Sequence, residues 1–130
     1  MDNTQNIFIA CKNGDLEEVK FLVENGADLE SKSNKGYTPL ILAASSYENF
    51  EIVKFLVDQG ANIEAKSNQG YTPLLSASWS NNIEIVKFLI ENGADLEDDD
   101  GNKFTHFLTK EKKEEIEKII FDIRSINIKG

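Results

Sequence analysis

The feature that most constrains this chain is an internal repeat. Residues 34–67 begin NKGYTPLILAAS and end EIVKFLVDQGANIEAKS, and residues 68–100 repeat the pattern as NQGYTPLLSASW followed by EIVKFLIENGADLEDDD. Tyr37 in the first copy corresponds to Tyr71 in the second, so the period is close to 34 residues. A repeat of this length predicts small supersecondary units that bury their apolar faces by stacking on one another.

Partial copies flank the two full ones. The N-terminal stretch ACKNGDLEEVKFLVENGADLESKS lacks only the opening phrase, and KFTHFL followed by IEKIIF is a degraded copy near the C-terminus. One residue is inserted near 47–49 in the first full copy. We therefore predict a single repeat domain over 1–130, with an N-terminal capping repeat (1–33), two full repeats (34–67 and 68–100) and a degenerate C-terminal capping repeat (101–130).

Each full copy carries signals for two helices. Thr38–Pro39 and Thr72–Pro73 place a capping hydroxyl and a first-turn proline at the start of a short helix. The apolar segment 52–57 predicts a second, largely buried helix, and Gly60 ends it because glycine accepts the left-handed backbone. The polar stretch 61–70 contains Asn-Gln-Gly and predicts a hairpin-like finger.

The residues that carry these signals resemble the ankyrin repeat family. The resemblance rests on TPLILAA and TPLLSAS at the helix starts and on the endings NGADLE, QGANIE and NGADLE. It implies an all-α chain with short β-hairpin-like fingers, built as a helix-turn-helix solenoid of about four repeats with degenerate terminal caps. It also implies a concave face, formed by the fingers and first helices, that binds a protein partner.

Three departures from the family pattern are visible. Ile41 and Leu75 stand where the family usually has histidine, which predicts apolar packing between repeats. Glutamate replaces the usual asparagine after the Gly-Ala-Asp phrase, at Glu30, Glu64 and Glu97. Thr105–His106 replaces Thr-Pro in the last copy, and Asp122 falls where a leucine is expected, which suits a terminal cap facing water.

The chain offers little for catalysis or metal binding. His106 is the only histidine, and Cys11, the only cysteine, occupies a slot filled by small residues in the other copies, so we expect it to be a buried structural residue. The Asp98–Asn102 run lacks the spacing of a calcium loop. We predict no enzyme activity, no cofactor and no metal site.

Charge limits the class of partner. The formal net charge of −9 argues against nucleic acid and anionic membrane as ligands, because both require a basic surface. No apolar run approaches the ~20 residues of a membrane span. We expect an intracellular, cytoplasmic protein that binds another protein.

Aromatic residues mark candidate contact positions. Tyr37, Tyr71 and Phe104 recur at one finger position and predict a ladder along the concave face, whose rings either contact a partner or stiffen the stack. Trp79 is expected beside them on an exposed first-helix position, and such residues are typical of binding hot spots.

Positions that vary between the copies extend the candidate set. Lys35 changes to Gln69, Ser45 to Trp79 and Lys66 to aspartate, and the basic candidates also include Lys12 and Lys32. Together with the aromatic residues, they predict a partner-binding face that runs from positive to negative along the stack.

We therefore expect a protein–protein interaction module, such as an adaptor or scaffold, that is monomeric or forms a homodimer. A stoichiometric inhibitor or immunity-type protein and a self-associating structural protein are the alternatives.

The C-terminal stretch 111–130 has an apolar helical stripe (Ile116, Ile119, Ile120 and Ile123) and predicts a helix that caps the core; a free amphipathic docking helix is the alternative.

Overall fold

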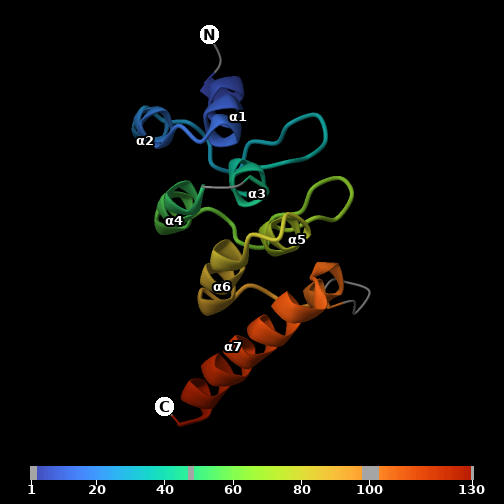
Figure 1. The fold of residues 1–130 in the computed structure, drawn as a ribbon. Helices are drawn as coiled ribbons and strands as arrows, with labels where there is room; N and C mark the ends of the chain where they lie inside the picture. Colours follow the sequence, from blue (N-terminus) through green and yellow to red (C-terminus); the bar gives the residue numbers. More distant parts are fainter. Residues whose placement is uncertain (1–2, 47–48, 98–102, 130) are drawn as a thin grey trace.

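The chain folds into a stack of helical pairs. The computed structural model describes residues 3–46, 49–97 and 103–129. In Figure 1 the second helix of each pair lies on one side of the stack, the first helix lies in the middle, and looped fingers project on the other side. The elements of the described residues are α1 (Asn3–Asn13), α2 (Leu16–Glu24), α3 (Pro39–Ala44), α4 (Phe50–Asp58), α5 (Pro73–Trp79), α6 (Ile83–Glu91), the 3-10 helix η1 (Phe104–Phe107) and α7 (Lys110–Lys129).

The helices begin and end where the sequence predicts. The Thr38 hydroxyl accepts a hydrogen bond of 3.3 Å from the Ile41 N–H, and Thr72 accepts one of 3.2 Å from Leu75, so both threonines cap their helices. Gly60 follows α4 with φ of 93°. This left-handed backbone ends the helix, as predicted.

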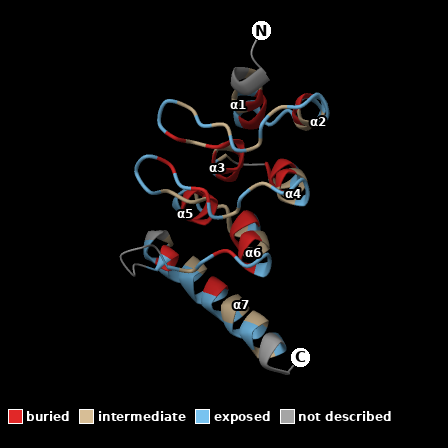
Figure 2. Ribbon diagram, turned by 180° about the vertical axis from the view of Figure 1, so that it is seen from behind, coloured by how far each residue is buried: buried red, intermediate tan, exposed pale blue. Residues whose placement is uncertain are grey.

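The core is a continuous column between the two rows of helices. Figure 2 shows the buried residues on the facing sides of the helices, from α1 at one end to the first half of α7 at the other. Val19, Val53 and Val86 occupy equivalent positions on the second helices and are fully buried. Cys11 and Ala44 are equally buried on the first helices, where small residues allow close packing between neighbouring repeats.

Asparagine side chains connect successive repeats. Asn49 Nδ2 donates a hydrogen bond of 2.8 Å to the carbonyl of Cys11, at the end of α1. Asn82 Nδ2, one repeat later, donates to the carbonyls of Ala44 and Ser46 at 3.3 and 2.9 Å. Each asparagine therefore satisfies carbonyls at the end of the preceding first helix, which have no partner within that helix.

The fingers are hairpin-like turns. Finger 1 (27–37) joins α2 to α3, and finger 2 (61–71) joins α4 to α5. Finger 2 is closed by hydrogen bonds from the Ser67 N–H to the Tyr71 carbonyl (2.9 Å) and from the Gly70 N–H to the Ser67 carbonyl (2.9 Å). The described residues form no regular strand, and Glu97 and Lys103 make an isolated β-bridge.

Two of the repeated glutamates join neighbouring fingers. Glu30 Oε2 accepts a hydrogen bond of 2.9 Å from the Asn62 N–H, and Glu64 Oε1 accepts one of 2.9 Å from the Asp95 N–H. The carboxylate of one repeat thus binds the backbone of the next. Glutamate here has a structural role that its position in the sequence did not reveal.

The C-terminal segment closes the stack with one long helix. The four-residue η1 stands where the first helix of a fourth copy is expected, and α7 follows it with 20 residues. Ile116 is fully buried, and Ile119, Ile120 and Ile123 pack against the core in part. This arrangement agrees with a capping helix, and Asp122 is exposed as predicted.

Candidate functional site

A hollow of about 350 Å³ lies between finger 1, finger 2 and the helices α3 and α5. We call it the aromatic hollow. None of its lining residues is charged, and two tyrosines and a tryptophan supply its aromatic surface. The lining residues are Tyr37, Ile41, Leu42, Ser45, Gln69, Tyr71, Ser76, Trp79 and Ser80.

The two tyrosines are positioned by the same local structure. The Tyr37 N–H donates to the Ser33 hydroxyl at 3.1 Å, and the Tyr71 N–H donates to the Ser67 hydroxyl at 3.1 Å. Both side chains are half-buried, and Tyr71 packs against the core. Because the surrounding turns repeat, the two rings occupy equivalent places one repeat apart.

Trp79 is exposed in the hollow, at 67%. It is the last residue of α5, and the smaller Ser45 stands at the equivalent position after α3. The Ser80 hydroxyl donates a hydrogen bond of 2.8 Å to the Ser45 carbonyl, which ties the ends of the two helices together. The indole is thus carried on a fixed helix end beside a small neighbour.

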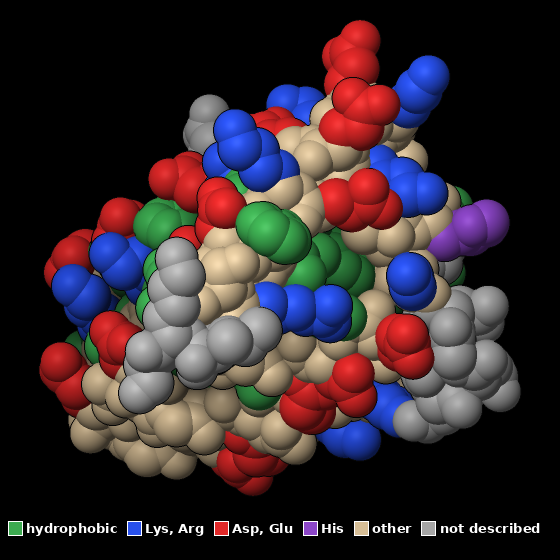
Figure 3. Space-filling model, turned by 90° about the horizontal axis from the view of Figure 1, so that it is seen from below, with side chains coloured by type: hydrophobic (Ala, Val, Ile, Leu, Met, Phe, Trp, Pro, Cys, Tyr) green, Lys and Arg blue, Asp and Glu red, His purple; other side chains and the backbone are tan. Residues whose placement is uncertain are grey.

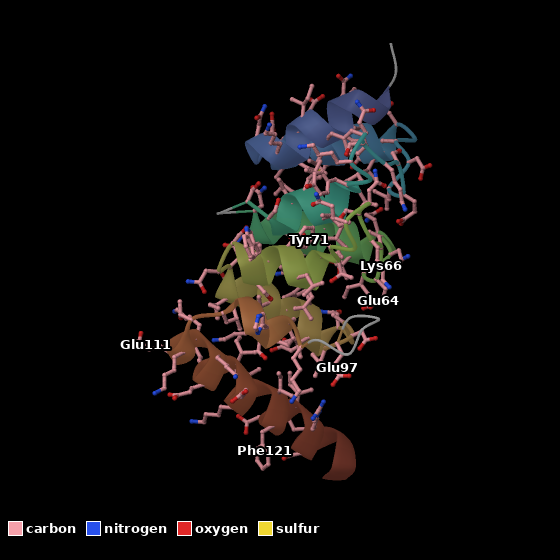
Figure 4. All side chains as sticks on the ribbon, turned by 90° about the vertical axis from the view of Figure 1, so that its right-hand side faces the viewer. Glu64, Lys66, Tyr71, Glu97, Glu111 and Phe121 are labelled. Carbon is pink, nitrogen blue, oxygen red and sulfur yellow. The ribbon has the colours of Figure 1, made fainter. Side chains whose placement is uncertain are left out.

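A second hollow of about 390 Å³ lies on the other side of the tip of finger 2 and shares Gln69 with the first. We call it the acidic hollow, because three carboxylates and one ammonium group lie in its lining. Its lining consists of Glu64, Lys66, Gln69, Gly70, Thr72, Leu75, Asp95, Leu96, Glu97 and Phe104. Figure 4 shows Tyr71, Lys66, Glu64 and Glu97 following one another down the finger side of the stack.

The predicted site residues separate into three groups. Tyr37, Ser45, Gln69, Tyr71 and Trp79 come together in the aromatic hollow, and Lys66 lies in the acidic hollow. Lys12, Lys32 and Lys35 are exposed but line neither hollow. The Lys32 ammonium instead approaches the Lys66 carbonyl at 3.4 Å.

The prediction that Phe104 continues an accessible aromatic ladder was wrong. Its side chain is only 2% exposed and belongs to the core. The Phe104 N–H donates to the Leu96 carbonyl at 3.2 Å, and η1, which Phe104 begins, packs against α5. This packing places the ring under the acidic hollow, where a partner could reach little of it.

Four lining residues of the aromatic hollow were missed as site residues. Ile41 was recognised in the sequence only as a replacement for the family histidine, and Leu42, Ser76 and Ser80 were not considered. A helical projection of the first helices could have found Leu42, because it lies three residues before Ser45. Ser80 becomes part of the hollow through its tertiary contact with α3.

Cys11 lies away from the hollows, in the core. Burial raises the pKa of its thiol to about 12, because the apolar surroundings disfavour the thiolate. The thiol is therefore protonated at neutral pH. This agrees with the structural role predicted from its small equivalents.

Two further observations concern the described residues. They contain no group of three or more His, Cys, Asp or Glu side chains arranged to hold a metal ion. None of their helices combines the length and apolar character needed to cross a membrane. The Asp98–Asn102 run that was considered for calcium, and the insertion near 47–49, fall at least in part outside the described residues.

Comparison with known proteins identifies the repeats. Comparison with curated proteins gives no significant match. The family model for ankyrin repeats, in three copies, matches residues 7–100, and η1 and α7 lie beyond it. Because this match covers most of the chain, the protein belongs to the ankyrin repeat family, whose repeats are generally protein–protein interaction modules.

Proposed function

We propose that this protein binds another protein through the aromatic hollow. The observation that carries the proposal is the meeting of Tyr37, Tyr71 and the 67% exposed Trp79 around one uncharged depression. Aromatic side chains combine a large apolar area with a polar atom and dominate binding energy at interfaces. The hollow therefore suits an apolar or aromatic side chain of the partner.

The rigid setting of the hollow supports a role in recognition. Its walls are helices and closed turns, and serine hydroxyls accept hydrogen bonds from the N–H groups of both tyrosines, which fixes the backbone that carries the rings. A surface that is already ordered loses little conformational entropy on binding, which favours affinity. We assign no catalytic role to it.

Affinity capture from a lysate of the source cell tests this proposal. The bait proteins are the wild type, Trp79→Ala and a control, Phe21→Ala, which removes an aromatic side chain that is 58% exposed on α2. We expect a near-stoichiometric partner with the wild type and the control, and at least a tenfold loss with Trp79→Ala. Equal capture by Trp79→Ala, with an unchanged melting curve, would contradict the proposal.

The captured protein also distinguishes the biological uses of the surface. An enzyme or toxin whose activity is blocked at a 1:1 ratio would make this protein a stoichiometric inhibitor. An adaptor would hold two proteins at once. A concentration-dependent mass in light scattering, lost in Trp79→Ala, would instead identify self-association.

A further inference from the structure

A third hollow continues the finger side of the stack onto α7. It has a volume of about 280 Å³ and shares Leu96 and Glu97 with the acidic hollow. The rest of its lining consists of Lys103, Thr105 and, on α7, Glu117, Ile120, Phe121 and Arg124. We call it the cap hollow, and it lies partly on a helix that no ankyrin repeat of the family match includes.

The three hollows are contiguous. Gln69 lines both the aromatic and the acidic hollow, and Leu96 and Glu97 line both the acidic and the cap hollow. Figure 4 shows Tyr71, Glu64, Glu97 and Phe121 in this order from the middle of the stack to its lower end. The hollows therefore follow one another along the stack, the first two on either side of the finger 2 tip, and we call this row of hollows the track.

Exposed aromatic side chains stand at the two ends of this track. Trp79 is 67% exposed in the aromatic hollow, and Phe121 is 69% exposed in the cap hollow. Figure 3, seen from the α7 end, shows hydrophobic side chains gathered near the middle of the face and bordered by charges of both signs. An apolar centre with a charged rim is the usual composition of a protein-binding surface.

The middle of the track carries an excess of negative charge. Glu64, Asp95 and Glu97 contribute carboxylates to the acidic hollow, whereas Lys66 is its single cationic residue. Two carboxylates are oriented by the backbone, because Glu64 accepts from the Asp95 N–H and Asp95 Oδ1 accepts from the Glu97 N–H at 3.2 Å. A cationic side chain placed here would gain from complementary charge.

We propose that the track binds one extended segment of the partner, with an apolar side chain at each end and a basic residue between them, and that Phe121 is its second anchor. Stacked helices lie 8–10 Å apart, so the track spans about 20 Å, which about six extended residues cover. This inference rests on the proposed function of the aromatic hollow. It adds α7 to the binding surface, although the sequence favoured a capping role for this segment over a docking helix.

Selection from a random 12-residue peptide library, with the full-length protein as target, tests the inference. We expect enriched peptides in which a lysine or arginine lies between two apolar residues. Their affinity should fall roughly tenfold or more in Trp79→Ala and in Phe121→Ala. Glu97→Lys should weaken binding several-fold at low salt and less at high salt, since salt screens exposed charges.

Ile126→Ala is the matched control for Phe121→Ala. Ile126 is 70% exposed on the same helix but lines none of the three hollows, so its removal should leave the affinity unchanged. Because Trp79, Phe121 and Ile126 are all exposed, the three variants are expected to fold, and melting curves check this.

The possible outcomes separate the two proposals. Peptides that depend on both Trp79 and Phe121 support both. Peptides that depend on Trp79 but bind Phe121→Ala normally overturn the extension onto α7 and leave the aromatic hollow in place. Peptide binding that depends on neither residue counts against both proposals. A library that yields no enriched peptide overturns the proposal of an extended partner segment. In that case affinity capture still tests the aromatic hollow.

Discussion

Asn49 Nδ2 donates a hydrogen bond of 2.8 Å to the carbonyl of Cys11, which lies 38 residues earlier in the chain. Asn49 is buried, so water does not replace this bond when the side chain is changed. The same arrangement recurs with Asn82 and the end of α3. An asparagine that precedes the second helix therefore links each of these two repeats to the repeat before it.

Asn49→Asp should destabilise the protein by about 2–3 kcal/mol. The carboxylate cannot donate to the Cys11 carbonyl, and it leaves two buried acceptors facing each other. Asn92→Asp is the control, because Asn92 donates a similar 2.8 Å bond to the Phe88 carbonyl at an exposed position. Urea denaturation of both variants measures the difference, and equal losses would show that the link between repeats contributes little.

Gly36→Ala should destabilise the protein more than Gly70→Ala. Both glycines have positive φ, 81° and 85°, so alanine is strained at either position. At Gly36 an added Cβ would also lie 2.7 Å from the Asn68 backbone nitrogen, whereas at Gly70 nothing lies within 4 Å. We expect a loss of about 1 kcal/mol for Gly70→Ala and a clearly larger one for Gly36→Ala, measured by thermal melting. A reversed order would mean that the fingers are not in contact as described.

Cys11 should make stability fall in alkaline solution. Burial raises its pKa from 9.0 to about 12, so the unfolded chain loses the thiol proton first as the pH rises. The protonated thiol therefore makes its full contribution to the free energy of unfolding below pH ~9. This contribution is lost between pH ~9 and ~12, at up to about 1.4 kcal/mol per pH unit. Cys11→Ala copies Ala44 of the next repeat and should remove this part of the slope. Urea titrations of both proteins across that range test it, and parallel curves would contradict it.

Removal of residues 114–130 should lower the melting temperature sharply. The deletion uncovers the core surface beneath the fully buried Ile116, and Ile116→Ala alone should cost about 2–5 kcal/mol. A chain that ends after Ser125 is the control, because it loses the 70% exposed Ile126 but keeps the isoleucines that pack on the core. An unchanged melt for the longer deletion would exclude the capping role.

Lys35→Glu should slow association with the captured partner at low salt. Lys35 is exposed and lines none of the hollows, so it can act only through long-range attraction. Lys118→Glu, an equal charge change on exposed α7, is the control. Stopped-flow rates at two salt concentrations measure the effect, and identical rates for the two variants would remove the first-half lysines from the proposed binding face.

Much of the fold could be predicted because the relevant signals are local. Thr-Pro at the helix starts, glycine at the helix ends and apolar residues at helical spacing act within a few residues of chain. Repetition then strengthened each signal, since the same phrase occurs at Thr38 and Thr72. The aromatic hollow could also be predicted in part, because Tyr37 and Tyr71 occupy corresponding positions in stacked units and Trp79 was expected beside them.

Other features depended on the packing of the last unit. The sequence predicts Phe104 to be a third member of the tyrosine series, but it is buried in the core because η1, which it begins, packs against α5. Phe121 stands where α6 has Phe88, which packs edge-to-face against Phe50 at 5.6 Å, yet on α7 it is exposed. The repeat pattern alone could not distinguish these two outcomes.

The sequence by itself determined the period, the helical pairs, the turns and the apolar column, because these follow from short-range conformational preferences and from hydrophobic periodicity. The tertiary structure decided which side chains of equivalent positions are accessible, since accessibility depends on what lies on the other side of each unit. It also decided that Glu30 and Glu64 bind the backbone of the next repeat. Hydrogen bonds between residues more than 30 positions apart form only when the repeats are stacked.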